Sequence, residues 1–486
     1  MKRKLFIILS TLVLIITLLF SFVFKDNKEN NKENNKEISK VEKILSKPEG
    51  IQAYTLDNEK TNISYENLIN YYTLDKITCK NGTIATFNKI DNSVSLSNIH
   101  MPDYCTMNFT DKTLYSHLMK DNSTIKTRTD FSTTFTETNT GTLYKTTESI
   151  AGSTPVTVYY FSGNAKNNWL KFGTWKENKR IVMGYSSDQK SYAKYDSLHS
   201  CNNSETNNFY CEEINIANVG DPMYWRIIRT NHDGSVRLLY SGTSPSSTNT
   251  GLELMYFNDV YNTPCSVGYK YGNSSSLDGC RENTKDSSAK IYLENWFNKN
   301  LIELENYTSS NAVYCNNRTL GISQSFSNDS DFYYYGKNLI VDGVNPSYNC
   351  NDIRDAFSVL NKYATINYSI ALMTVDEVIF ASGAHTEVNE IKAYYSVNSN
   401  NEKNTDTVAT ALLTPALFGR PYEGAGNLTG NIAFINNLVG YNSNGKLGYS
   451  SWPGKYVIRP VISIKGDNLW SSGDGSASNP YTIKEV

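Results

Sequence analysis

The chain has 486 residues, of which 19% are charged and 39% hydrophobic, with a formal net charge of −2 at neutral pH. These proportions allow hydrophobic cores of ordinary size. The near-neutral charge, without a basic stripe interleaved with aromatic residues, argues against nucleic acid as a partner.

The first element is an apolar, uncharged stretch at residues 5–24, preceded directly by Lys2, Arg3 and Lys4. At about 1.5 Å per residue a helix of this length crosses a hydrocarbon core of about 30 Å, and the basic flank keeps the short end in the cytoplasm. A cleaved signal peptide is the alternative. Because the stretch is long and ends in bulky residues, we predict that residues 1–24 form an uncleaved, single-pass signal anchor at the cell membrane. The chain after it is then extracytoplasmic.

Three segments follow the anchor. Residues 25–47 consist largely of Lys, Glu and Asn and predict a disordered tether. Residues 48–110 predict a small β module, in which Cys79 and Cys105 lie in short strands and Asn81-Gly82 forms a tight turn. Residues 111–150 begin with a short helical pattern and continue as a Thr-rich stretch, which predicts a connector.

Residues 151–486 predict the main surface domain. Its expected strands include residues 156–161 and a hairpin, 224–230 with 235–240, whose corner is Asp233-Gly234. The last long strand is expected at residues 455–465, with Pro460 at a sheet edge or bulge because proline cannot donate to a ladder.

Two helices are expected in this domain. One covers residues 289–304, capped by Ser287 or Ser288, and the other covers residues 375–382. Thr374 and Glu377 have the spacing of a capping box at the start of the second helix. Both helices present apolar faces that predict core positions. The fold class is therefore α+β, with a transmembrane helix, a disulfide-stapled β module and a larger mixed domain with antiparallel hairpins.

All eight cysteines lie beyond the apolar stretch, which predicts disulfides in an exported chain. The short separations favour sequential pairing: Cys79 with Cys105, Cys201 with Cys211, Cys265 with Cys280, and Cys315 with Cys350. A zinc site is the alternative, but it requires close pairs such as CxxC or HxxxH, which the sequence lacks. We predict no metal and no cofactor.

No catalytic residue is predicted. The five histidines are isolated from one another, and GxSxG, P-loop and dinucleotide-binding motifs are missing. Three arginines, Arg226, Arg229 and Arg459, lie between apolar strand residues, where they could bind a carboxylate ligand or pair with internal acids. Aromatic residues in candidate loops, namely Tyr333, Tyr334, Tyr335 and Trp452, could form a ligand surface together with Arg459, although core packing is the alternative for each.

Several blocks of the sequence, including residues 159–173, 224–243, 370–383, 458–465 and 475–483, resemble a group of uncharacterised surface proteins of low-GC Gram-positive bacteria. The similarity covers residues 159–486. It implies a distant likeness to C-type-lectin-like and formylglycine-generating-enzyme-like folds, although the redox cysteines of such enzymes and the calcium-binding motifs of such lectins are missing. Fold likeness alone does not fix function.

The sequence therefore favours a membrane-anchored binding or adhesion protein whose ligand, a glycan or a protein, lies outside the cell. The alternatives are an enzyme that acts on the cell envelope and a structural envelope component.

Overall fold

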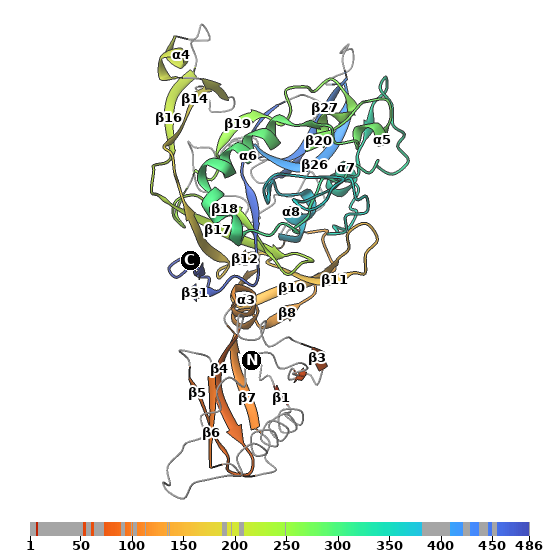
Figure 1. Cartoon of the computed structure of the whole chain (residues 1–486). Helices are drawn as coiled ribbons and strands as arrows, with labels where there is room; N and C mark the ends of the chain where they lie inside the picture. The colour runs from red at the N-terminus through yellow and green to blue at the C-terminus, as the bar shows by residue number, and fades with distance from the viewer. Residues whose placement is uncertain are drawn as a thin grey trace, which may run out of the picture. The chain divides into compact units, whose positions relative to one another are not determined.

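The computed structural model describes residues 6–7, 52–54, 60–62, 72–88, 93–98, 100, 105–111, 113–133, 135, 137–186, 192–195, 197–203, 209–247, 249–381, 409–420, 428–436, 446–449 and 454–485. These residues separate into two compact units, 1–120 and 121–486 (Figure 1). The predicted tether lies outside the described residues, as does the predicted anchor apart from Phe6–Ile7, where the structure has a short strand instead of the predicted helix. No helix in the described part is long and apolar enough to cross a membrane.

The first unit consists mainly of antiparallel β-strands. Strands β1 (Phe6–Ile7), β2 (Gln52–Tyr54) and β3 (Lys60–Asn62) form one small sheet. Strand β4 (Tyr72–Cys79) pairs with β7 (Cys105–Asp111), and β5 (Ile84–Asn88) pairs with β6 (Ser93–Ser97). Gly82 has φ +96° in the turn between β4 and β5, as the Asn-Gly pattern predicts. The register of β4 and β7 places Cys79 opposite Cys105. The predicted short helix is α3 (Leu114–Asp121).

The larger unit is built on an eight-stranded sheet of order β25-β30-β18-β17-β11-β10-β8, with β13 also paired to β17. Its strands are β8 (Thr124–Lys126), β10 (Thr142–Glu148), β11 (Val156–Tyr160), β13 (Trp169–Thr174), β17 (Pro222–Thr230), β18 (Val236–Tyr240), β25 (Ile370–Ala371) and β30 (Val461–Ile464). The predicted hairpin is confirmed, because β17 and β18 pair antiparallel around Gly234 at φ +78°.

The segment expected as a connector contributes strands to this sheet. Strands β8 and β10 pair in parallel with each other, and β10 pairs antiparallel with β11. Strand β9 (Thr138–Asn139) pairs with β12 (Asn164–Ala165). Threonine is β-branched and suits strands, but their partners are set by distant residues. The larger unit accordingly begins at Asp121 rather than at residue 151.

A second sheet of six strands has the order β19-β29-β26-β27-β28, with β23 paired to β26. Its strands are β19 (Glu253–Tyr256), β23 (Phe332–Tyr333), β26 (Thr410–Gly419), β27 (Thr429–Asn436), β28 (Lys446–Gly448) and β29 (Lys455–Ile458). The single strand expected at residues 455–465 is wrong, since β29 and β30 belong to different sheets. Pro460 lies between them, and its carbonyl accepts a hydrogen bond from the Tyr240 amide.

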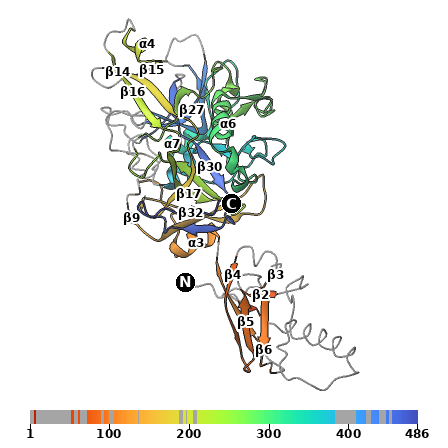
Figure 2. The ribbon, with the colours of Figure 1, turned by 60° about the vertical axis from the view of Figure 1, so that its left-hand side comes forward.

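Three further strands, β14 (Lys179–Ser186), β15 (Tyr192–Tyr195) and β16 (Phe209–Ala217), form a ribbon. Figures 1 and 2 show it extending away from the rest of the larger unit, with α4 (Leu198–Asn202) near its end. The short strand pairs are β20 (Lys270–Tyr271) with β21 (Lys285–Asp286), β22 (Tyr314–Cys315) with β24 (Ala356–Phe357), and β31 (Trp470–Ser472) with β32 (Thr482–Ile483).

Both expected helices are present. Helix α6 (Ser288–Asn300) starts after Ser287, whose side chain accepts a hydrogen bond from the Lys290 amide. It is shorter than expected because the chain continues as the 3₁₀ helix η2 (Ile302–Tyr307). Helix α8 (Val375–Ala381) begins with the predicted capping box: the Glu377 amide donates to Thr374 Oγ1, and the Thr374 amide donates to Glu377 Oε2. Every residue of α8 is buried.

Three of the predicted disulfides are present, namely Cys201–Cys211, Cys265–Cys280 and Cys315–Cys350. One part of the core is an aromatic cluster in which Trp175, Trp225 and Trp296 surround Tyr240. The Trp175 indole N–H donates to the Tyr240 hydroxyl at 2.9 Å, so this buried pair satisfies its polar atoms within the cluster. The fold is mixed α+β and rich in strands.

Candidate functional site

The main candidate site is an open hollow of about 630 Å³ on the larger unit. Its lining combines aliphatic side chains with a few polar ones: Ala151, Leu277, Arg281, Thr319, Leu320, Asn351, Asp352 and Ile353. Ligand sites of proteins commonly combine an apolar lining with a few polar groups in this way.

Disulfides and a short ladder hold the walls of the hollow. Leu277 starts the short helix α5 (Leu277–Cys280), whose last residue is bonded to Cys265. Strand β22 pairs with β24, and in this pair Cys315 lies opposite Ala356. The Cys315–Cys350 disulfide holds the chain just before Asn351. The lining residues therefore come from four chain segments, at residues 151, 277–281, 319–320 and 351–353. The Ala151 amide donates to the Cys350 carbonyl, and the Arg318 side chain bonds the Cys280 carbonyl, so these segments are held to one another.

Behind the lining, Arg318 is fully buried and uses all five of its N–H donors. Its Nε donates to Asp355 Oδ1 at 2.6 Å, and its Nη2 donates to Asn283 Oδ1 and to the Arg354 carbonyl. Its Nη1 donates to the carbonyls of Lys270 and Cys280. Because every N–H of this planar guanidinium has an acceptor, Arg318 holds the chain segments that it contacts in fixed positions. Arg318 therefore acts as an internal brace.

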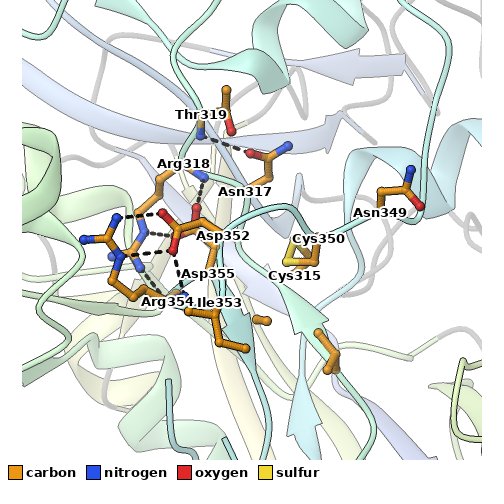
Figure 3. The surroundings of a disulfide bond; sticks show 12 residues. Cys315, Asn317, Arg318, Thr319, Asn349, Cys350, Asp352, Ile353, Arg354 and Asp355 are labelled. Carbon is orange, nitrogen blue, oxygen red and sulfur yellow. Dashed lines mark hydrogen bonds and ion pairs between the residues drawn. A yellow bond between two sulfur atoms is a disulfide. The ribbon is translucent and has the colours of Figure 1, made fainter. Parts of the chain in front are cut away.

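The remaining charges near the hollow are also paired. Arg281 lies 3.1 Å from Asp355 and 3.3 Å from Asp352, and Arg354 bonds both oxygens of Asp352. These hydrogen bonds from Arg354 hold the pKa of the Asp352 carboxyl at about 2. Figure 3 shows Arg318, Asp352, Arg354 and Asp355 together on one side of the Cys315–Cys350 disulfide. Arg354 also lies 2.8 Å from Asp278, so three arginines face three carboxylates and the wall is electrically balanced.

The two charged residues of the lining are Arg281 and Asp352. They lie 3.3 Å apart and neutralise each other. Among the described residues no group of His, Cys, Asp and Glu could hold a metal ion.

The three neighbouring tyrosines predicted as a ligand surface have different environments. Tyr334 is fully buried and its hydroxyl donates to the Pro264 carbonyl at 2.7 Å, so it belongs to the core and not to a surface. Burial raises the pKa of the Tyr334 hydroxyl. Tyr333 lies in β23 with the Lys337 ammonium 3.2 Å from its ring centre, and the half-buried Tyr335 begins helix α7 (Tyr335–Val341).

Arg459 lies inside the protein. It is 6% exposed, and its guanidinium donates to the Tyr240 carbonyl at 2.7 Å and to Ser241 Oγ at 3.1 Å. Arg226 donates to the Ala165 carbonyl and lies over the Trp169 ring. These contacts are structural, and they correct the prediction that Arg459 forms part of a ligand surface. Trp452 lies outside the described residues.

Arg229, the third strand arginine, belongs to a buried ion cluster. It lies 3.0 Å from Glu148 and 3.1 Å from Glu377, and Arg237 approaches Glu377 to 2.5 Å. The two arginines lower the pKa of Glu377, although burial alone would raise it. The carboxyl of Glu377 therefore performs two tasks, capping α8 and pairing with two strands of the main sheet.

The sequence did not reveal the hollow. Its lining residues are far apart in the chain and follow no motif. One signal was present: the run Asp352-Ile353-Arg354-Asp355, which begins two residues after Cys350, carries charges of both signs.

The function has to be argued from the geometry of this hollow and from the chain around it. The resemblance noted from the sequence blocks stays a prediction. Comparisons with protein-family models, with curated proteins and with solved structures find no match for this chain.

Proposed function

We propose that the chain is an extracytoplasmic binding protein, held at the membrane by residues 5–24, that uses the hollow to bind a segment of another protein. The disulfides among the described residues indicate folding in an oxidising, extracytoplasmic environment. The anchor rests on the sequence argument of length and flanking charge.

The proposal rests on the aliphatic lining of the hollow together with the ion-paired wall behind it. Leu277, Leu320 and Ile353 offer aliphatic surface that an apolar side chain of a ligand can cover, and Thr319 and Asn351 at the exposed edge offer polar contacts. The braced wall behind them reduces the ordering cost of binding, because the site is already in place.

A protein segment is favoured over a glycan. Sugar-binding surfaces rely on aromatic rings that stack on pyranose faces, and none of the described residues that line the hollow is aromatic. The balanced charges of Arg281 and Asp352 favour a ligand with little net charge. A glycan, as the lectin-like resemblance implies, is the second ligand class, and an envelope-acting enzyme is the alternative function.

The proposal is tested with the full chain probed against a random displayed peptide library and a glycan array. Enriched peptides carrying an apolar residue are expected, and Leu320→Asp should weaken their binding at least tenfold. The matched control is Leu360→Asp, because Leu360 is 64% exposed and does not line the hollow. Equal binding by both variants would refute the site, and enrichment of glycans alone would refute the ligand class.

A further inference from the structure

A second cluster of reactive groups lies on α6, away from the residues that line the hollow. Lys290 is 1% exposed and Glu294 is 6% exposed. Oε2 of Glu294 lies 2.7 Å from Lys290 Nζ and also accepts a 2.7 Å hydrogen bond from Asn367 Nδ2. Asp286 Oδ2 lies 3.0 Å from the same ammonium. One carboxylate oxygen therefore contacts both an amine and a carboxamide.

The segment that carries Asn367 is fixed against α6. Its backbone N–H donates to Glu294 Oε1 at 2.7 Å, and the next residue, Tyr368, stacks on Phe297 with ring centres 4.8 Å apart. The Tyr368 hydroxyl donates to Asn298 Oδ1 at 2.9 Å. Because both groups contact the same Glu294 oxygen, the amine and the carboxamide lie close to each other, which lowers the entropy cost of a reaction between them.

We propose that Lys290 and Asn367 form an intramolecular amide cross-link, with Glu294 as the group that transfers the proton. Glu294 takes a proton from the Lys290 ammonium, and the neutral amine attacks Cγ of Asn367. Glu294 then returns the proton to Nδ2, the Cγ–Nδ2 bond breaks, and ammonia leaves. The new bond joins Nζ to Cγ. The amine nitrogen gives its second proton to the departing ammonia, which ends as ammonium. No oxidant or further reactant is consumed.

Burial supports this reaction. Lys290 and Glu294 are both shielded from water, so little water can compete with the amine for the carboxamide carbon. Asn367, in contrast, is exposed, so ammonia can leave to solvent. The product would tie α6 covalently to the chain just before β25 of the main sheet.

The test is peptide mapping and intact mass of the purified full chain after its cysteines are reduced and alkylated. A mass lower than the sequence mass by one ammonia is expected, together with a branched peptide that contains Lys290 and Asn367. Glu294→Gln should restore the full mass, whereas Lys299→Ala, on the same helix but paired with Glu177 at the surface, should keep the loss.

A wild-type chain of full sequence mass, with Lys290 in a linear peptide, would overturn the cross-link. The same conclusion would follow if ammonia were lost at another asparagine. The wild-type measurement decides by itself, so a misfolded Glu294→Gln variant does not leave the proposal open.

Discussion

Asp376 and Glu377 are adjacent in the first turn of α8, and replacing each by its amide should change stability in opposite directions. Burial raises the pKa of the Asp376 carboxyl from 3.8 to about 7, and the nearby Glu377 adds to this, against the hydrogen bond from the Ser347 amide and the charge of Arg229. Above pH 7 the folded protein therefore contains an ionised buried carboxylate. Asp376→Asn removes that charge while its Oδ1 can still accept the Ser347 hydrogen bond.

The size of the expected stability change follows from the difference between the pKa of Asp376 in the folded and in the unfolded protein. Because the folded-state pKa is raised, the contribution of Asp376 is fully present below about pH 4 and is lost as the pH rises to 7. Each pKa unit corresponds to about 1.4 kcal/mol, and pairing the new amide N–H groups has its own cost. Linkage alone gives Asp376→Asn an advantage of roughly 4 kcal/mol at pH 8 and almost none at pH 4. The cost of the amide applies at every pH, so the variant should be more stable than the wild type by roughly 2–4 kcal/mol at pH 8 and equal to it or slightly less stable at pH 4.

Glu377→Gln is the matched control. It leaves Arg229 and Arg237 without the acid that they share, which should cost about 3–5 kcal/mol at pH 8. The assay is unfolding of the full chain followed by tryptophan fluorescence between pH 4 and pH 8.5. All six tryptophans lie beyond residue 120, so the signal reports on the larger unit. Destabilisation by Asp376→Asn at pH 8, or a gain that does not vary with pH, would refute the reasoning.

Three further predictions can be checked separately. Arg318→Lys replaces five hydrogen-bond donors by three and should lower the free energy of unfolding by about 3 kcal/mol. Arg354 is partly exposed, so Arg354→Lys should cost less than about 1 kcal/mol in the same unfolding assay. Equal effects of the two variants would contradict the bracing role of Arg318. Non-reducing peptide mapping should find Cys79 joined to Cys105, as the β4–β7 register allows, and a link from Cys79 to any later cysteine would exclude it. Protease shaving of intact cells should remove the carboxy-terminal domain, and protection of that domain would contradict the predicted topology.

The sequence patterns predicted those structural features that depend on residues close to one another in the chain. The hairpin around Gly234 and the capping box at Thr374 follow from turn chemistry and side-chain reach over a few residues. The second role of Glu377 could not be predicted in this way, because its arginine partners lie on β17 and β18, far away in the chain. The strands β8 and β10 were missed for the same reason.

The candidate site was less predictable than the fold. Tyr334 lies beside residues that are partly exposed, yet its hydroxyl reaches the Pro264 carbonyl in the interior. Its burial depends on how β23 meets β26, which no pattern in residues 333–335 encodes. The hollow depends on four segments held together by disulfides, backbone hydrogen bonds and Arg318, so its residues share no spacing that a sequence could display.

The passage of the chain from β29 to β30 through Arg459 and Pro460 has a consequence for how the larger unit opens. The six-stranded and eight-stranded sheets are joined there by only two residues, and the Arg459 guanidinium is bonded to the Tyr240 carbonyl at the end of β18. Neither sheet can separate at this point without pulling on the ladder of the other. Amide protons of Val457 and Ile462, which lie in different sheets, should therefore become accessible to solvent exchange in a single cooperative event.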